Sequence, residues 1–449
     1  MEAIHNNRAG AAAPPTAGWY PWYVVLVLML AQTFSFIDRM IMGLLVEPVR
    51  ASFGISDTQY SLLAGMAFAV FYAVMGLPLA RIADRYSRRW LISIGIAVWS
   101  VMTALCGLAQ SFWGLFLARV GVGVGEASLS PAAYSMITDY FPRGVLARAL
   151  SLYTVGVTIG SGLAYMIGAE VVAYVESLGE VIVPLIGRVE GWQATFLAVG
   201  LPGVLVAVLM LATVREPERK GGLASAGQGI PVAEVVAFVA ARKRAFLCHI
   251  LGMSAYIMVV FSLNVWGPTY LMRGFGFAPS TAGWITGMAM MIGGTVGLLS
   301  GGLIADRWFS RGNSDAYSQV IMITAACLLP FAVAMGFVTD PTLAVACLSL
   351  AIFFSAFQGG ISGGVIQLMT PNQMRGQAVA LYFLGANLLG LGLGPTVVAA
   401  TTDYVFQSDA ALGKSIALVA AVLVPLALAV MLYGARARRE AILEAQQWS

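Results

Sequence analysis

Four charged residues stand inside long apolar stretches, and they are the part of the sequence best suited to do chemistry. Asp38 and Arg39 are adjacent in the first apolar stretch, and Arg119 and Glu126 lie together in a later one. A charge at the centre of a lipid bilayer costs at least ~2.5–3.5 kcal/mol, so such residues usually pair, face water or take part in function. Two helical turns place Arg119 and Glu126 on one helix face, separated by about 10 Å.

These four residues combine fixed positive charge with protonatable carboxylates. Burial raises the pKa of a carboxylate and a nearby arginine lowers it. A carboxylate that gains and loses an arginine partner during a transport cycle therefore changes its affinity for a proton. Asp38 and Glu126 are both candidates for this role, and Arg39 and Arg119 are candidates to bind an anion. The alternative is a structural ion-pair cluster that locks the two helices together.

The composition places these residues in a membrane protein. The chain has 449 residues, of which 59% are hydrophobic and only 10% charged, and its mean hydropathy is +0.84. Soluble domains carry about 25% charged residues. This excludes a water-soluble enzyme and a disordered scaffold. The net charge of +4 is too small for a nucleic-acid-binding surface.

An all-α membrane protein with twelve transmembrane helices is expected. A spanning helix needs about 20 predominantly apolar residues. The stretches that meet this need are about 22–48, 58–80, 90–109, 112–137, 149–169, 191–214, 245–270, 279–303, 316–339, 341–374, 376–402 and 415–435. Asp38, Arg39, Arg119 and Glu126 are the charges that these bounds place inside helices, away from the helix ends.

Lysine and arginine in the connecting segments predict the orientation. With both termini cytoplasmic, nineteen of them fall on the inner side and four on the outer: Arg50, Arg188, Arg273 and Lys414. We therefore expect an integral protein of a bacterial inner membrane. The predicted parts are a cytoplasmic tail (1–21), a six-helix bundle (22–214), a cytoplasmic linker (215–244), a second six-helix bundle (245–434) and a cytoplasmic tail (435–449). A short amphipathic helix is expected after Pro231 in the linker.

The two bundles are related by an internal repeat. Three short matches share one offset of 222 residues: Phe53-Gly54 with Phe275-Gly276, Gly65-Met66-Ala67 with Gly287-Met288-Ala289, and Ala83-Asp84-Arg85 with Ala305-Asp306-Arg307. Duplicated, pseudo-symmetric bundles place a binding site at their interface, near the midplane.

The loop at Ala80–Arg89 resembles the G-x-x-x-D-R-x-G-R-R motif of the major facilitator superfamily, with its two glycines replaced by Ala80 and Ser87. The second copy, Gly302–Arg307, lacks most of the trailing basic residues. The resemblance implies a transporter, not an enzyme, with a cytoplasmic gate. It assigns the gate to Asp84, Arg85, Arg88 and Arg89, and more weakly to Asp306 and Arg307.

Within that superfamily, the segment Phe36–Arg39, the pair Arg119 and Glu126 and the turn Phe53–Ser56 resemble the spinster-like branch. This branch is implicated in lysolipid and sphingolipid-type transport. The helix-one pattern also occurs in organic-anion symporters of the superfamily. The G-x-x-x-G-P pattern of drug antiporters is incomplete at Gly156–Ser161, where the proline is missing, and it occurs instead on another helix at Gly390–Pro395. Drug/proton antiport therefore ranks lower.

Helices seven and ten carry no charge between their ends. They offer an uncharged and largely apolar wall opposite the charged cluster, with Tyr256, Asn264, Trp266, Phe354 and Gln358 as candidate cavity residues. Such a site suits an amphipathic organic ion. We expect a monomeric secondary transporter, driven by protons, with no cofactor, no metal, no catalytic residue and no nucleic-acid partner. A channel and a lipid-modifying enzyme are the other classes considered. The duplicated gate motif disfavours a channel. The chain has only two histidines, which disfavours the catalytic cluster that an enzyme would need.

Overall fold

The structure is a computed structural model that describes residues 18–178, 181–183, 187–219, 231–371 and 374–446. Within these ranges, eleven helices are long and apolar enough to cross a membrane, and the shorter apolar helix α15 (Pro341–Ala356) adds a twelfth. The expected all-α membrane fold is confirmed. The chain also forms one short hairpin in which β1 (Val181–Val183) pairs antiparallel with β2 (Gly187–Val189).

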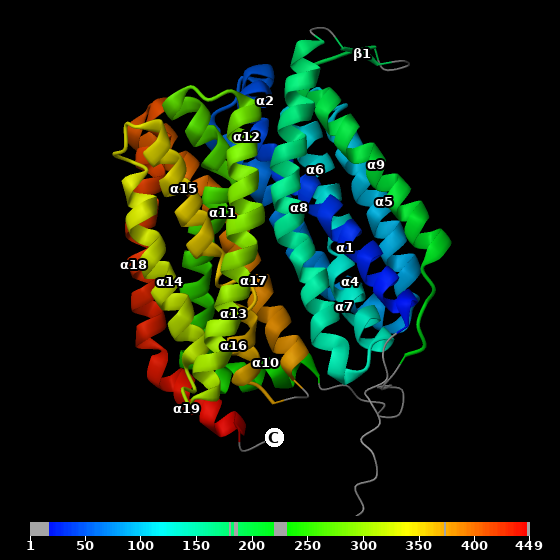
Figure 1. Ribbon diagram of the computed structural model, residues 1–449, viewed down its shortest axis with the longest axis vertical. Coiled ribbons are helices and arrows are strands. Elements are labelled where there is room, and N and C mark those ends of the chain that lie inside the picture. The colour runs from blue at the N-terminus through cyan, green and yellow to red at the C-terminus, as the bar shows by residue number, and fades with distance from the viewer. Residues whose placement is uncertain (1–17, 179–180, 184–186, 220–230, 372–373, 447–449) are drawn as a thin grey trace, which may run out of the picture.

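The first group of helices packs into one bundle, which runs from blue to green in Figure 1. In this bundle α1 packs against α8 and α9, and α5 packs against α6 and α9. Its helices are α1 (Trp19–Met40), η1 (Ile41–Leu44), α2 (Val46–Phe53), α3 (Asp57–Ser61), η2 (Leu62–Met66), α4 (Ala67–Arg85), α5 (Arg88–Cys106), α6 (Phe112–Glu126), α7 (Leu129–Tyr140), α8 (Arg143–Ser177) and α9 (Gly191–Thr213).

The second group packs beside it, from green to red in Figure 1. Here α11 packs against α17 and α18, and α14 against α15 and α18. Its helices are α10 (Val232–Ala241), α11 (Lys243–Phe275), α12 (Pro279–Met288), η4 (Ala289–Gly294), α13 (Thr295–Ser310), α14 (Ala316–Ala334), α15, α16 (Ser362–Leu368), α17 (Arg375–Ala400), η5 (Thr401–Phe406), η6 (Asp409–Ala411), α18 (Leu412–Tyr433) and α19 (Ala435–Gln446).

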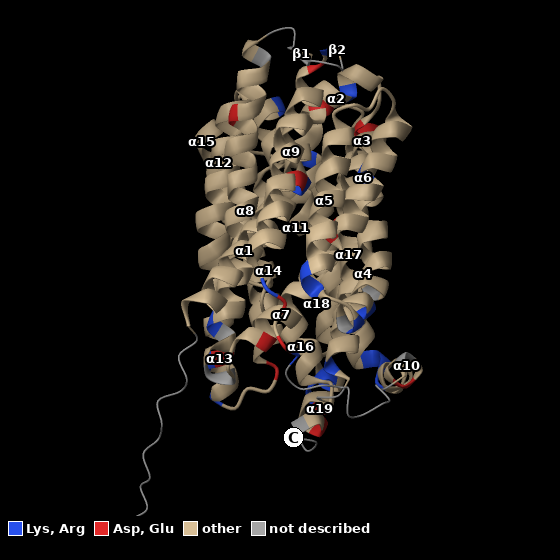
Figure 2. Ribbon diagram, turned by 90° about the vertical axis from the view of Figure 1, so that its right-hand side faces the viewer, with Lys and Arg blue, Asp and Glu red and all other residues tan. Residues whose placement is uncertain are grey.

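Two seams join the halves. Helix α8 packs against α12 and η4 on one side, and α17 packs against α3, η2 and α4 on the other. Most charged residues lie toward the two ends of the bundle and a few lie at mid-height, as Figure 2 shows. Apolar side chains therefore form most of both the interior and the outer wall, as a bilayer requires.

Several expected helices are interrupted. The helix expected over 22–48 breaks at η1, where the Tyr60 hydroxyl donates to the Met42 carbonyl and Thr269 donates to the Gly43 carbonyl at 3.4 Å. These bonds satisfy carbonyls that a continuous helix would have used. The helix expected over 341–374 ends at Ala356, because two adjacent glycines follow at Gly359 and Gly360.

The last helix is fixed to the second bundle by a buried ion pair. Arg438 on α19 donates through Nε to Asp315 Oδ1 at 2.7 Å and through Nη2 to Oδ2 at 2.9 Å, and both side chains are fully buried. Such a bidentate pair fixes geometry as well as charge. The short stretch expected after Pro231 forms helix α10, which packs against α11 and α17.

Candidate functional site

The predicted charged cluster is brought together between α1 and α6. Arg39 donates to Glu126 Oε2 at 2.6 Å, and the Ser35 hydroxyl donates to the same oxygen at 2.7 Å. The Arg39 and Glu126 side chains are only 9% and 1% exposed. The Arg39 guanidinium also lies 4.4 Å from the centre of the Phe68 ring and 5.2 Å from that of Tyr72. Ring faces attract a cation at this range.

Arg119 takes a different position in the cluster. It is fully buried, and its Nη1 donates to the backbone carbonyl of Asp38 at 3.1 Å. Its Nε and Nη2 atoms have no hydrogen-bond partner among the described residues, and neither do Asp38 Oδ1 and Glu126 Oε1. Buried polar atoms are normally bonded. The cluster therefore holds unused donors and unused acceptors in one place.

The candidate cavity residues of the second half are largely committed to their own half. Tyr256 and Trp266 are fully buried; the Tyr256 hydroxyl donates to the Phe354 carbonyl at 3.4 Å and the Trp266 indole donates to the Pro395 carbonyl at 3.0 Å. The Phe354 ring stacks on Phe331. Asn264 and Gln358 are partly exposed. The polar atoms of Tyr256 and Trp266 are thus not offered to a ligand.

The Ala80–Arg89 motif makes its described contacts within one half. Arg88 is buried and binds Asp139, and its Nε donates to Glu216 at 2.8 Å. Arg89 donates through its guanidinium to the Leu211 carbonyl. Arg85 is exposed, and the side chain of Asp84 lies outside the described part of the chain.

The second copy of the motif makes a lighter contact. Asp306 accepts a hydrogen bond from the Tyr317 hydroxyl at 2.5 Å, and Arg307 is exposed. Both residues of the Asp306–Tyr317 bond belong to the second half.

Glu216 is the acidic centre of the first motif. Burial raises the pKa of its carboxyl, but three donors offset this: the backbone N–H of Arg89, the guanidinium of Arg88 and the hydroxyl of Ser87. The net result is a pKa below the ordinary value, so Glu216 is held ionised at neutral pH.

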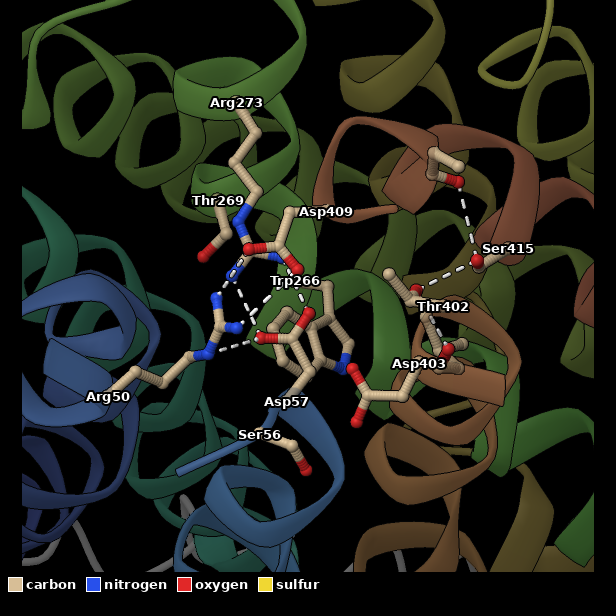
Figure 3. Close-up of polar contacts among 12 residues, drawn as sticks. Arg50, Ser56, Asp57, Trp266, Thr269, Arg273, Thr402, Asp403, Asp409 and Ser415 are labelled. Carbon is tan, nitrogen blue, oxygen red and sulfur yellow. Dashed lines mark hydrogen bonds and ion pairs between the residues drawn. The ribbon is translucent and has the colours of Figure 1, made fainter. Parts of the chain in front are cut away.

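At the end of the molecule that carries α2 and α3, an ionic network joins the two halves (Figure 3). The charge distribution in the sequence predicts that this end faces outward, and we call it the outer end. Arg273 on α11 forms a bidentate pair with Asp57, at 2.6 and 2.8 Å, and binds Glu47 at 2.5 Å. Arg50 approaches Asp57 at 3.1 Å and Asp409 of the second half at 3.0 Å. Asp57 is fully buried between the two guanidinium groups. We call these five residues the outer network.

Further bonds close the same end. Asp403 accepts from both the backbone N–H and the hydroxyl of Thr58, at 2.7 and 2.6 Å, and the Tyr165 hydroxyl donates to the Asn264 carbonyl. Asp57, Asp403 and Asp409 bring carboxylate oxygens within 4.8 Å of one another, the spacing that a metal ion would need. Arg50 and Arg273 already neutralise Asp57, so the arrangement is an ion-pair network rather than a cation site.

The sequence interpretation missed the outer network because charges at helix ends are ordinary. The repeat did contain a signal. Arg50 and Arg273 each lie just before the repeated Phe-Gly pair, and both turn glycines, Gly54 and Gly276, have left-handed backbone angles (φ of 62° and 68°). A charge within a spanning helix was also missed: the helix expected to end at 169 runs on to Ser177 and so includes Glu170.

Comparison with known proteins extends this picture. The family model of the Major Facilitator Superfamily matches residues 28–395. A protein of Mycolicibacterium smegmatis described as an MFS-type efflux pump is 31% identical over 99% of both chains. A hexuronate transporter of Bacillus subtilis is 24% identical over 85% of this chain and 87% of its own.

Among solved structures, a bacterial homologue of the human lysosomal transporter spinster, in an inward-facing and unoccupied conformation, is similar throughout. It aligns with a TM-score of 0.76 and 27% identity, and the match covers 98% of this chain and 100% of that one.

Proposed function

This chain belongs to the major facilitator superfamily of transporters, and we propose that it carries an amphipathic organic ion by alternating access, driven by the proton gradient. The lysolipid or sphingoid class is the first candidate substrate. The likeness to a bacterial spinster homologue supports this choice over most of the chain.

The buried charged cluster is the observation that carries the proposal. Within the described part of the chain, Arg119 has donors without a partner that can receive an anionic group, and Arg39 holds Glu126 through one oxygen only. In our scheme, protonation of Glu126 releases Arg39, and protonation of Asp38 removes a negative charge beside Arg119. A substrate anion that binds either arginine favours that protonation. The proton and the substrate then bind to the same conformational state, so the free energy of the proton gradient can drive transport of the substrate.

An amphipathic substrate fits the contrast between the two walls. The N-terminal wall carries the four charges, while the facing wall has its Tyr256 and Trp266 polar atoms bonded within its own half. A sugar needs hydrogen-bonding groups on all sides, whereas an amphipathic ion needs them only around its head group. The closed outer network supports a state whose binding site opens toward the cytoplasm.

The test is uptake into proteoliposomes with an imposed pH gradient, against lysolipids, organic acids and cationic drugs. Asp38→Asn or Glu126→Gln should abolish gradient-driven accumulation yet leave counterflow, because exchange needs no net proton movement. Arg119→Ala should weaken binding as well, and Arg119→Lys need not rescue it, since an ammonium does not reproduce the guanidinium fork. Wild-type accumulation in both carboxylate variants would make the cluster structural.

Efflux of a drug-like compound by proton antiport is the second candidate. The full-length relative described as an efflux pump favours it. Organic-anion symport is the third, favoured by the hexuronate transporter. The direction of the pH change inside the vesicles separates them, because symport and antiport move the proton in opposite senses relative to the substrate.

A further inference from the structure

Glu170 is a carboxylate on the outer wall of a membrane-spanning helix. It lies about 10 Å, or seven residues, before the outer end of α8, and it is exposed. Its Oε1 accepts a hydrogen bond from the Trp284 indole of α12 at 2.5 Å. Among the described residues no basic side chain pairs with it. A carboxylate in this position is costly unless a cation compensates it.

The helices that carry these two residues are in very close contact. A Cβ placed on Gly162 of α8 would lie 2.7 Å from the Gly287 carbonyl, and one on Gly287 of α12 would lie 2.6 Å from the Gly162 carbonyl. No larger residue fits this seam without a shift of the backbone. The bond between Glu170 and Trp284 therefore lies over a seam between the two halves.

Apolar side chains form a groove beside the carboxylate. The groove holds about 460 Å³ and is lined by Glu170, Trp284, Tyr174 and, further along α8, by Leu163, Met166 and Ile167. Tyr174 is 66% exposed and Trp284 is 43% exposed, so both rings are available to a ligand. One end of the groove is acidic and aromatic, and the rest is aliphatic.

We propose that this groove binds a single-chain amphiphile with an ammonium head group. Glu170 supplies the missing counter-charge, and the Trp284 and Tyr174 rings contact the methyl or methylene groups of the cation. Aromatic faces with a carboxylate are the usual receptor for quaternary ammonium groups. The alkyl chain lies along the aliphatic part of the groove.

This site deepens the proposed function. Its role would be to admit substrate from the outer leaflet of the membrane, and that role rests on the proposed function. A ligand on Glu170 competes with the Trp284 indole, which bridges the halves. An amphiphile bound there would loosen the seam that must open for alternating access. The class of substrate this site selects carries a cationic or zwitterionic head on one chain.

Binding is tested without transport, on the full chain in dodecyl maltoside, whose head group is uncharged. The probes are hexadecyltrimethylammonium and, with the same chain and the opposite charge, hexadecyl sulfate, each titrated by calorimetry. Two variants separate charge from hydrogen bond. Glu170→Gln keeps an acceptor for the indole and loses the charge, whereas Trp284→Phe keeps charge and ring and loses the indole N–H.

Glu170→Gln should weaken binding of the ammonium probe about tenfold. Binding of the sulfate should not weaken, because the variant removes the carboxylate that repels it. Trp284→Phe should bind the ammonium probe at least as well as the wild type, and Trp284→Leu should weaken it. The control is Asp340→Asn, which removes an exposed carboxylate at the same end and keeps the cap of α15.

Equal ammonium affinity in Glu170→Gln and Asp340→Asn would overturn the site, as would equal affinity of the wild type for both probes. A protein that binds the ammonium probe through Glu170 but accumulates nothing in proteoliposomes would instead overturn the proposed function and leave the site intact.

Discussion

The two ends of the molecule use their charges differently. At the outer end, Arg273 binds Asp57 and Glu47 across the boundary between the halves, and Arg50 binds Asp409 across it. At the opposite end, which we call the inner end, the described pairs of Arg88 with Glu216 and of Arg438 with Asp315 each join parts of one half. The outer charges hold the halves together, and the inner charges hold each half in shape.

This difference indicates which contacts must break during transport. In the proposed alternating-access cycle the outer end must separate, and the pairs between the halves are then lost to water. The pairs within a half persist through the same motion. The ion pairs at the outer end therefore set the relative populations of the outward-closed and outward-open states. The ion pairs at the inner end stabilise both states alike.

The largest expected effect comes from the inner end. Arg88→Met should lower the free energy of unfolding by roughly 3 kcal/mol, because removal of one partner leaves the buried carboxylate of Asp139 without this cation. Thermal unfolding in detergent measures the loss. The exposed pair of Arg436 and Glu440 gives the control, and Arg436→Met should have little effect.

The same Arg88→Met variant should leave the outer end unchanged. Spin labels at Ile182 and Thr342, both exposed at that end and in different halves, report the separation. A changed distance distribution in this variant would contradict the division of labour between the two ends.

Breaking the outer network should change the conformation instead. In Arg273→Met, Asp57 keeps Arg50, so the fold is retained while the main bond across the halves is lost. Relative to the outward-closed state, the outward-open state should be about 2 kcal/mol more stable in the variant than in the wild type, which is the usual contribution of a hydrogen bond to a charged group. The distance between the labels at Ile182 and Thr342 should lengthen.

Asp409→Asn is the matched variant for this experiment. It also crosses the halves, but its side chain is 55% exposed, so the shift should stay below about 1 kcal/mol. Equal shifts in Arg273→Met and Asp409→Asn would argue that burial plays no part in the closure.

The smallest effect is the pH dependence of Glu216. Its folded pKa lies below the ordinary value of 4.5, so its contribution to stability is complete above that value and is lost as the pH falls through the folded pKa. The difference in melting temperature between wild type and Glu216→Gln should therefore be constant near neutral pH and close in acid. A difference that grows on acidification would reverse the sign of the assigned shift.

The spanning helices and the charged cluster could be predicted from the sequence because each depends on local pattern. Length and hydropathy define a span, and a charge inside a span is conspicuous. The breaks in these helices could not be predicted in the same way. The end of α1 depends on hydroxyl donors from Tyr60 and Thr269, which are remote in the sequence.

The sequence showed which residues of the cluster could meet, but not how they pair. The bond between Arg39 and Glu126, and the turn of Arg119 toward a backbone carbonyl, depend on the rotation of α1 against α6. The outer network was invisible for a simpler reason. Asp57 and Arg273 are 216 residues apart, and each is an unremarkable charge near a helix end.

The buried pair of Asp315 and Arg438 has a consequence for biogenesis. The two residues are 123 positions apart, and Arg438 lies in the last helix of the chain. When α14 leaves the ribosome, Arg438 has not yet been made, so Asp315 lacks this partner and its carboxylate is stable only in water. Its burial has to await synthesis of α19, so docking of α19 follows the synthesis of α14. A nascent chain halted before Arg438 would present an unpaired carboxylate to the quality-control machinery of the cell.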